Sequence, residues 1–197
     1  MSRHLVSLWD LPTDGRSFHL DDQEIWLESI KKFHMDCRIN EPLQADIHVL
    51  PADNGCLVRG DLTGSVILPC NLCAEDTRVS LAQNFQEYEE IPEQPLPQRK
   101  VLNHQKKQDA TPEESSLIIW EQNSPMLDLD ALCWEEFILA LPFNPICRSG
   151  CKGLCPKCGA NLNQGPCGCS HEGSDDRMAS LRQLIIKPVD RTPGSNS

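Results

Sequence analysis

Six of the chain's eleven cysteines fall in a single stretch, residues 145–170, which reads PICRSGCKGLCPKCGANLNQGPCGCS. Within it, the segment Cys155-Pro-Lys-Cys158-Gly159 is the strongest chemical signal. Two cysteines separated by two residues can bind one tetrahedral metal ion, with sulfur–metal distances of about 2.3 Å. The glycine after the second cysteine allows the positive φ that a tight turn needs. This pattern indicates structural zinc, and disulfide bonds or a redox dithiol are the alternatives.

Eight cysteines are clustered, and their spacing divides them into two sets of four. The first set, site 1, is local in the sequence and comprises Cys155, Cys158, Cys167 and Cys169. The second set, site 2, joins a mid-chain CxxC pair to the start of the stretch and comprises Cys70, Cys73, Cys147 and Cys151. A four-cysteine zinc site has no open position for water, so both sites are predicted to be structural. The alternative is one zinc at site 1, with the mid-chain pair merely packed or redox-active.

Site 2 would clip the C-terminal segment to the body across more than 70 residues of chain. Four thiolates also suit iron, so the spacing alone does not fix the metal. The three remaining cysteines stand alone and are predicted to be ordinary buried small residues: Cys37, Cys56 and Cys133.

The mid-chain CxxC pair must be held by a hairpin. Three runs alternate apolar and polar residues with a period of two, which is typical of half-buried strands: residues 43–49, 57–68 and 77–88. Gly60 and Gly64 lie on the apolar face of the second run and predict a bulge or strong curvature there. Three successive strands favour an antiparallel meander. A redox CxxC pair opens a helix after a strand, whereas strands flank this pair on both sides.

Helical spacing of apolar residues predicts one helix after Asp21 and a second from Asp130 to Pro142. In the second helix, Glu135 and Glu136 are expected to point towards water. Short strands are predicted at residues 5–8, 117–120 and 126–129, and a further short helix at 176–186.

These elements predict an α+β protein, with a curved antiparallel sheet, flanking helices and a C-terminal zinc-binding module. Residues 1–142 form the predicted α+β body, which includes a Pro-rich flexible loop at 89–115. Residues 143–187 form the predicted zinc-binding module, packed on the body, and 188–197 a disordered tail.

The formal net charge of −11 is unevenly distributed. Residues 143–197 contain seven Lys and Arg against four Asp and Glu, whereas the rest of the chain contains eleven against twenty-five. An acidic body is repelled by phosphate backbones, so contact with nucleic acid requires a local basic patch or a partner protein. The basic candidates are Arg148, Lys152, Lys157, Arg177 and Arg182. Alternatively, these side chains only offset the negative charge of zinc thiolates.

The N-terminal sequence MSRHLVSLWDLP has no secretory-signal pattern, and no stretch approaches the ~20 apolar residues of a membrane span. Clustered cysteines then favour metal ligands in a reducing compartment over disulfides. We therefore expect a soluble, cytoplasmic protein.

The chain has no Gly-rich phosphate loop, no GxSxG and no HExxH. No enzyme activity and no small-molecule substrate are predicted, and a dithiol oxidoreductase at Cys70 or Cys73 is the enzymatic alternative.

Several of these segments together resemble one bacterial family. They are LPCNLC in mid-chain, LDLDALCWEEFILALP, and CRSGCKGLCPKCGANLNQGPCGC followed by DDR. They are similar to the YceD family, whose members are called large ribosomal RNA subunit accumulation proteins. The resemblance is specific over about residues 128–184 and fair over 57–87.

The resemblance implies a cytoplasmic, non-enzymatic ribosome-assembly factor needed for normal levels of 23S rRNA. Its partner would be the large-subunit rRNA precursor. A competing class is a protein–protein adaptor, whose acidic body binds a basic ribosomal protein without touching RNA.

Overall fold

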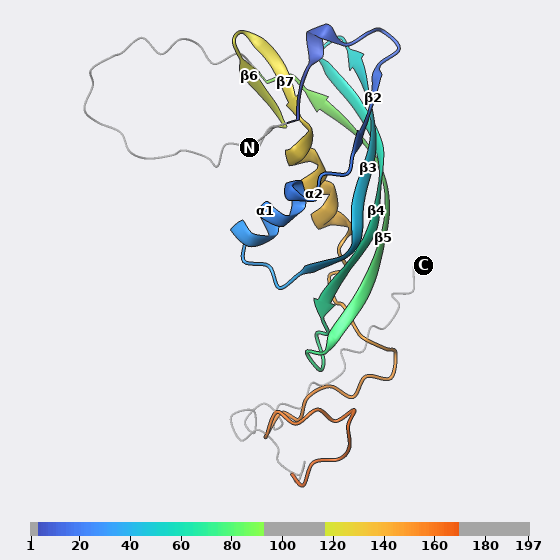
Figure 1. Cartoon of the computed structure of the whole chain (residues 1–197), viewed down its shortest axis with the longest axis vertical. Helices are drawn as coiled ribbons and strands as arrows, with labels where there is room; N and C mark the ends of the chain where they lie inside the picture. The colour runs from blue at the N-terminus through green and yellow to red at the C-terminus, as the bar shows by residue number, and fades with distance from the viewer. Residues whose placement is uncertain (1–3, 93–116, 170–197) are drawn as a thin grey trace, which may run out of the picture.

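The protein is described by a computed structural model over residues 4–92 and 117–169. Its largest element is an antiparallel four-stranded sheet with the strand order β2-β3-β4-β5. The strands are β2 (Arg16–Leu20), β3 (Arg38–Ala52), β4 (Gly55–Pro69) and β5 (Asp76–Glu90). The sheet bends along its length, and both α-helices of the described residues lie on its concave side (Figure 1).

Alternating side chains give this sheet one buried and one exposed face. Along β3 the buried residues are at most 2% exposed: Leu43, Ala45, Ile47 and Val49. The residues between them, such as Gln44 and Asp46, are exposed. β4 and β5 pair along their whole length, from Gly55 opposite Glu90 to Pro69 opposite Asp76. The predicted meander is confirmed, and β2 adds a fourth strand to it.

The bend has a local cause at Gly64, whose φ is 145°. A Cβ at this position would lie 2.7 Å from Leu43 Cδ2 and 2.8 Å from the carbonyl oxygen of Pro42. Opposite this glycine, the pairing of β3 with β4 shifts register twice between Ile39 and Gln44. Such irregular pairing bends a strand and increases its twist. The predicted irregularity is therefore found at Gly64, with the extra residues on β3, whereas Gly60 pairs regularly with Ile47 and Phe85.

Two helices cover the concave face, α1 (Glu24–Lys32) and α2 (Leu129–Ala140). Each contributes one fully buried aromatic side chain to the core, Trp26 from α1 and Phe137 from α2. Leu141, which precedes Pro142, is extended, since a residue before proline is disfavoured in the α region. The predicted end of the second helix is thus confirmed.

The predicted orientation of Glu136 is wrong. This residue is 1% exposed, and its Oε2 atom has no hydrogen-bond partner. The apolar residues of α2 are distributed over nearly all faces of the helix. Its sequence therefore does not define a single core-facing stripe. The packing instead turns Glu136 inward and leaves the apolar Ile138 and Leu139 exposed.

A second, three-stranded antiparallel sheet lies at one end of the molecule (Figure 1). It has the order β1-β7-β6, with β1 (Leu5–Ser7), β6 (Ile118–Glu121) and β7 (Ser124–Asp128). The single sheet expected from the sequence is therefore corrected to two. The short strands were predicted, but their pairing joins the start of the chain to its last third, which no local pattern reveals.

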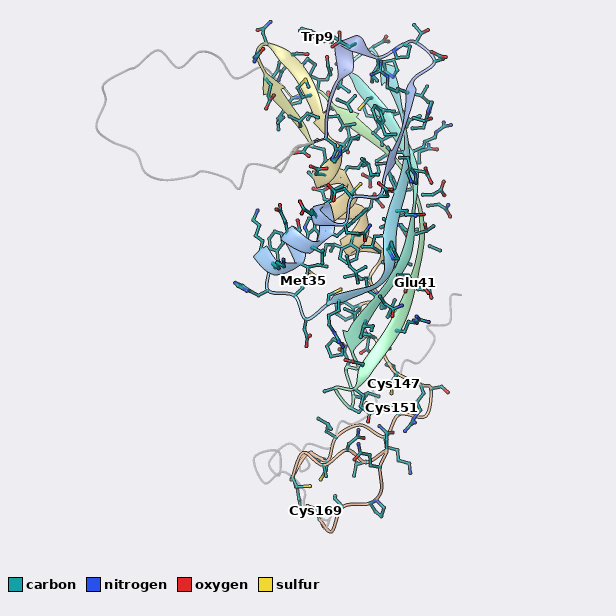
Figure 2. The ribbon with its side chains drawn as sticks, in the orientation of Figure 1. Trp9, Met35, Glu41, Cys147, Cys151 and Cys169 are labelled. Carbon is teal, nitrogen blue, oxygen red and sulfur yellow. The ribbon has the colours of Figure 1, made fainter. Side chains whose placement is uncertain are left out.

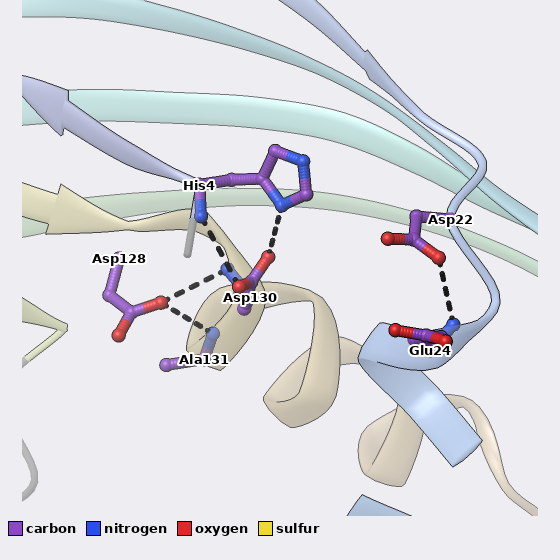
Figure 3. Close-up of polar contacts among 6 residues, drawn as sticks. All are labelled: His4, Asp22, Glu24, Asp128, Asp130 and Ala131. Atoms are coloured by element: carbon purple, nitrogen blue, oxygen red, sulfur yellow. Dashed lines mark hydrogen bonds and ion pairs between the residues drawn. The ribbon is translucent and has the colours of Figure 1, made fainter. Parts of the chain in front are cut away.

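The junction between β7 and α2 is fixed by side chains (Figure 3). Asp128 Oδ1 accepts hydrogen bonds from the backbone N–H groups of Asp130 and Ala131, both at 3.1 Å. His4 Nδ1 lies 2.7 Å from Asp130 Oδ1, and this contact holds the start of β1 against the helix. A capping aspartate satisfies N–H groups that have no partner within the helix, and α2 thereby starts at a defined residue.

No helix in residues 4–92 and 117–169 is long and apolar enough to cross a membrane. Most of the predicted Pro-rich loop, the predicted helix at 176–186 and the predicted tail lie outside the described residues. The start of that loop is corrected, because β5 continues to Glu90.

Candidate metal centres

The turn between β4 and β5 presents the CxxC pair at the tip of a long hairpin. The Cys70 N–H donates to the carbonyl oxygen of Glu75 at 2.8 Å, and the Ala74 N–H donates to that of Cys70 at 2.8 Å. Cys70 and Cys73 are only 3% and 4% exposed. The hairpin therefore holds both thiols in place and shields them from solvent.

Site 2 brings this pair together with the two cysteines that follow α2. The sulfurs of Cys70 and Cys151 are 3.9 Å apart, and those of Cys73 and Cys147 are 3.7 Å apart. All four sulfurs lie within 4.8 Å of one another. A tetrahedron with metal–sulfur bonds of about 2.3 Å has edges of about 3.8 Å, whereas a disulfide bond is about 2.05 Å long. The spacing fits a shared metal ion and does not fit disulfides.

Residues 143–169, here called the cysteine segment, are also tied to the hairpin by backbone contacts. The Asn71 N–H donates to the carbonyl oxygen of Pro145, and the Leu154 N–H donates to that of Leu72, at 2.8 and 2.9 Å. Gly153 has a φ of 72°, and a Cβ there would lie 3.0 Å from the Leu72 oxygen. Cys147 and Cys151 consequently lie at the hairpin tip (Figure 2).

Site 1 is a compact local turn farther from the sheet, with Cys169 at its far side (Figure 2). The Gly159 N–H donates to the Cys155 carbonyl oxygen at 2.8 Å, and Leu154 and Asn161 form an isolated β-bridge. The four sulfurs of site 1 also lie within 4.8 Å of one another. Cys155 is 2% exposed, but Cys158 is exposed. The structure thus groups the eight clustered cysteines in the same two sets as the sequence spacing does.

Backbone N–H groups favour thiolates at both sites. The N–H of Cys147 is the main cause that lowers the pKa of Cys70 to about 6. The N–H groups of Cys158 and Lys157 likewise lower the pKa of Cys155 to about 6. At site 1 the neighbouring sulfur of Cys158, together with burial, raises the pKa of Cys169 to about 12. Four thiols this close together cannot all ionise unless a cation balances their charge. A divalent metal ion bound between them would supply that charge.

A small polar network links two asparagines of the site 1 loop to the surroundings of site 2, and the sequence pattern did not reveal all of it. Asn163 Nδ2 donates to Cys151 Sγ at 3.3 Å, and Asn163 Oδ1 accepts from the Lys152 N–H at 2.9 Å. Asn161 Nδ2 donates to Glu75 Oε1 at 2.7 Å, while Cys73 Sγ lies 3.8 Å from Glu75 Oε2. Such contacts orient metal ligands and restrict their rotation. Glu75 was missed, because a carboxylate just after a CxxC pair has no distinctive spacing.

The predicted RNA-contact residues are only partly placed. Arg148, Lys152 and Lys157 are exposed in the cysteine segment, and Arg177 and Arg182 lie outside the described residues. Residues 143–169 contain no Asp or Glu. A zinc ion bound by four thiolates keeps a net negative charge, which these three basic side chains would offset.

The three solitary cysteines are buried, as predicted: Cys37, Cys56 and Cys133. Burial raises the pKa of Cys37 to about 11 and that of Cys56 and Cys133 to about 12. Neutral thiols of this kind are inert packing residues.

The fold and its cysteine groups define an α+β protein with two four-cysteine clusters that could each hold a metal ion. A family profile described as "Large ribosomal RNA subunit accumulation protein YceD" matches residues 58–185. Because this match spans more than half of the 197 residues, the chain belongs to the YceD family. The predicted family resemblance is confirmed.

One curated relative carries the family's name, and others are uncharacterized. The chain is 27% identical, over 73% of its length, to the "Large ribosomal RNA subunit accumulation protein YCED homolog 1, chloroplastic" of Arabidopsis thaliana. It is 29% identical over 77% of its length to an uncharacterized protein of Mycobacterium bovis, and 28% identical over 96% to one of Mycobacterium leprae. The match spans 48% of the Arabidopsis protein, 66% of the M. bovis protein and 83% of the M. leprae protein. The comparison with solved structures gave no match.

Proposed function

We propose that this chain is a non-enzymatic ribosome-assembly factor that supports the accumulation of 23S rRNA. The observation that carries the proposal is the family match, whose residues 58–185 include all eight clustered cysteines. The relevant partner is the large-subunit rRNA precursor, contacted through Arg148, Lys152 and Lys157, or a basic ribosomal protein bound to it. The protein acts in the cytoplasm, where thiols remain reduced and available to a metal.

The cysteine clusters bind structural zinc in this proposal. Site 2 joins the hairpin tip to the cysteine segment, and site 1 organises that segment internally. Four sulfur ligands leave no position for a water or substrate molecule, so the ions stabilise the fold rather than react. The buried Cys70 and Cys73 are poorly placed for thiol exchange with another protein, which disfavours the dithiol oxidoreductase alternative.

The rRNA role is tested by deleting the gene in the source organism and measuring the ratio of 23S to 16S rRNA. We expect a lower ratio, restored by the wild-type gene but not by a variant that carries both Cys70→Ser and Cys158→Ser. The matched control is Trp9→Ala, which changes an exposed residue far from both sites and should restore the ratio (Figure 2). An unchanged ratio after deletion would contradict the proposal.

The two sites should release zinc at different rates. Cys158 is exposed at site 1, whereas Cys70 and Cys73 are at most 4% exposed at site 2. A mild oxidant or a chelator should therefore remove one zinc ion in a fast phase and the second in a phase about tenfold slower or more. A colorimetric zinc indicator measures both phases. Cys158→Ser should eliminate the fast phase. Release of both zinc ions in a single phase would contradict the prediction that site 2 is better shielded from solvent than site 1.

A further inference from the structure

The outward face of α2 is apolar although it is exposed. At about 100° per residue, Trp134, Ile138 and Leu139 span an arc of about 140° on this helix. Ile138 is 40% exposed and Leu139 is 64% exposed. Trp134 is half-buried and stacks on Phe33 of the α1 end, with ring centroids 5.3 Å apart and planes 8° apart. A helix that is apolar on its solvent side usually packs against another surface.

Carboxylates line one side of this face. Glu135 lies inside the arc on α2, and Glu87 and Glu89 belong to the adjacent edge strand β5. Burial is the first cause that raises the pKa of Glu135 and of Glu89, and the charge of Glu87 raises both further. These three side chains are therefore close enough to repel one another.

Glu136, on the buried side of α2, is a fourth carboxylate next to this acidic group. It is 1% exposed, and Oε2 has no hydrogen-bond partner. The opposite side of the face differs, since Lys32 Nζ lies 5.2 Å from the centroid of the Phe33 ring. The surface is thus apolar in its centre, acidic towards β5 and basic towards α1.

We propose that the face formed by Phe33, Trp134, Glu135, Ile138 and Leu139 binds a Lys/Arg-rich, amphipathic segment of a protein partner. The apolar residues of that segment would cover Ile138 and Leu139, and its cations would face Glu135, Glu87 and Glu89. RNA does not fit this face, because phosphates would meet carboxylates. A second copy of this acidic chain would place like charges together. The inference rests on the proposed function only where it identifies this segment with the basic ribosomal protein named there.

The test uses full-length, zinc-loaded protein and two fluorescent peptides, an amphipathic Leu/Lys helix and its Leu/Glu counterpart. Fluorescence anisotropy should show binding of the Leu/Lys peptide alone, weakened by added salt. Leu139→Glu should reduce the affinity about tenfold or more, and Glu135→Gln about threefold. Both residues are at least partly exposed, and the thermal midpoint of each variant checks that folding is unchanged.

The matched control is Trp9→Glu, which places the same new charge at another exposed apolar residue (61% exposed). Its affinity for the peptide should equal that of the wild type. The proposal is overturned if Leu139→Glu binds the peptide normally, or if the control weakens binding equally. It is also overturned if Leu139→Glu instead abolishes binding of a single-stranded RNA oligonucleotide or dissolves a wild-type dimer. These binding measurements do not depend on the rRNA phenotype, so failure of one proposal is distinguishable from failure of the other.

Discussion

Replacing Cys70 by serine should lower the zinc content from two ions to one per chain and destabilise the fold strongly. Cys70 is 3% exposed and its sulfur lies 3.9 Å from that of Cys151, so the variant removes one of the four thiolate ligands of site 2. Structural zinc couples binding to folding, and we expect a loss of at least about 3 kcal/mol in the free energy of unfolding. For a chain of this size the thermal midpoint should fall by about 10 °C. Metal analysis and thermal unfolding measure the two effects.

Cys158→Ser is the matched control, since it also removes one ligand and one zinc ion but acts at site 1. Trypsin distinguishes the two variants at Arg148, which lies between two ligands of site 2 and is exposed. Cleavage after Arg148 should accelerate in Cys70→Ser and remain slow in Cys158→Ser. Retention of two zinc ions by Cys70→Ser would show that the hairpin tip is not part of a metal site.

Replacing Glu136 by glutamine should stabilise the protein at high pH. Burial is the main cause that raises the pKa of Glu136 from 4.5 to about 7, with further contributions from Glu87 and Glu135, while Gln83 lowers it. The folded state therefore holds the proton more tightly than the unfolded state. Stability that is fully present below about pH 4.5 is lost as the pH rises through about 7. The advantage of the glutamine variant should grow by about 2 kcal/mol from pH 5.5 to pH 8.

Denaturant unfolding at a series of pH values measures this difference. Glu28→Gln on α1 is the control, because Glu28 is exposed and its replacement should leave stability unchanged. Any effect of pH on zinc affinity would affect wild type, variant and control alike. If the free energies of unfolding of wild type and Glu136→Gln differ by the same amount at every pH in this range, the ionised Glu136 carboxylate does not destabilise the fold as predicted.

Local patterns predicted the parts of the fold that local physics determines. The alternation of Leu43, Ala45, Ile47 and Val49 predicted β3, since half-buried strands require that period. Pro142 predicted the end of α2 because of its steric effect on Leu141. The division of eight cysteines into two sets followed from spacing, which limits which thiols can meet at one tetrahedral ion.

The remaining features depend on tertiary contacts that no short window contains. The second sheet pairs Leu5 with Asp128, so neither strand reveals its partner locally. The inward position of Glu136 depends on how α2 rotates against β5, and its nearly uniform apolar sequence leaves that rotation open. Glu75 lies next to Cys73 along the chain, but its hydrogen bond with Asn161 forms only after the chain folds back over the hairpin tip.

The most direct test of the two-site account is the metal content of the wild-type protein, purified under reducing conditions without chelator. Native mass spectrometry should show two zinc ions per chain and all eleven cysteines as thiols or thiolates. Denaturing the same sample should release both ions. A metal-free chain with intramolecular disulfides, or a single ion per chain, would contradict the account that two four-cysteine sites hold the cysteine segment and the hairpin together.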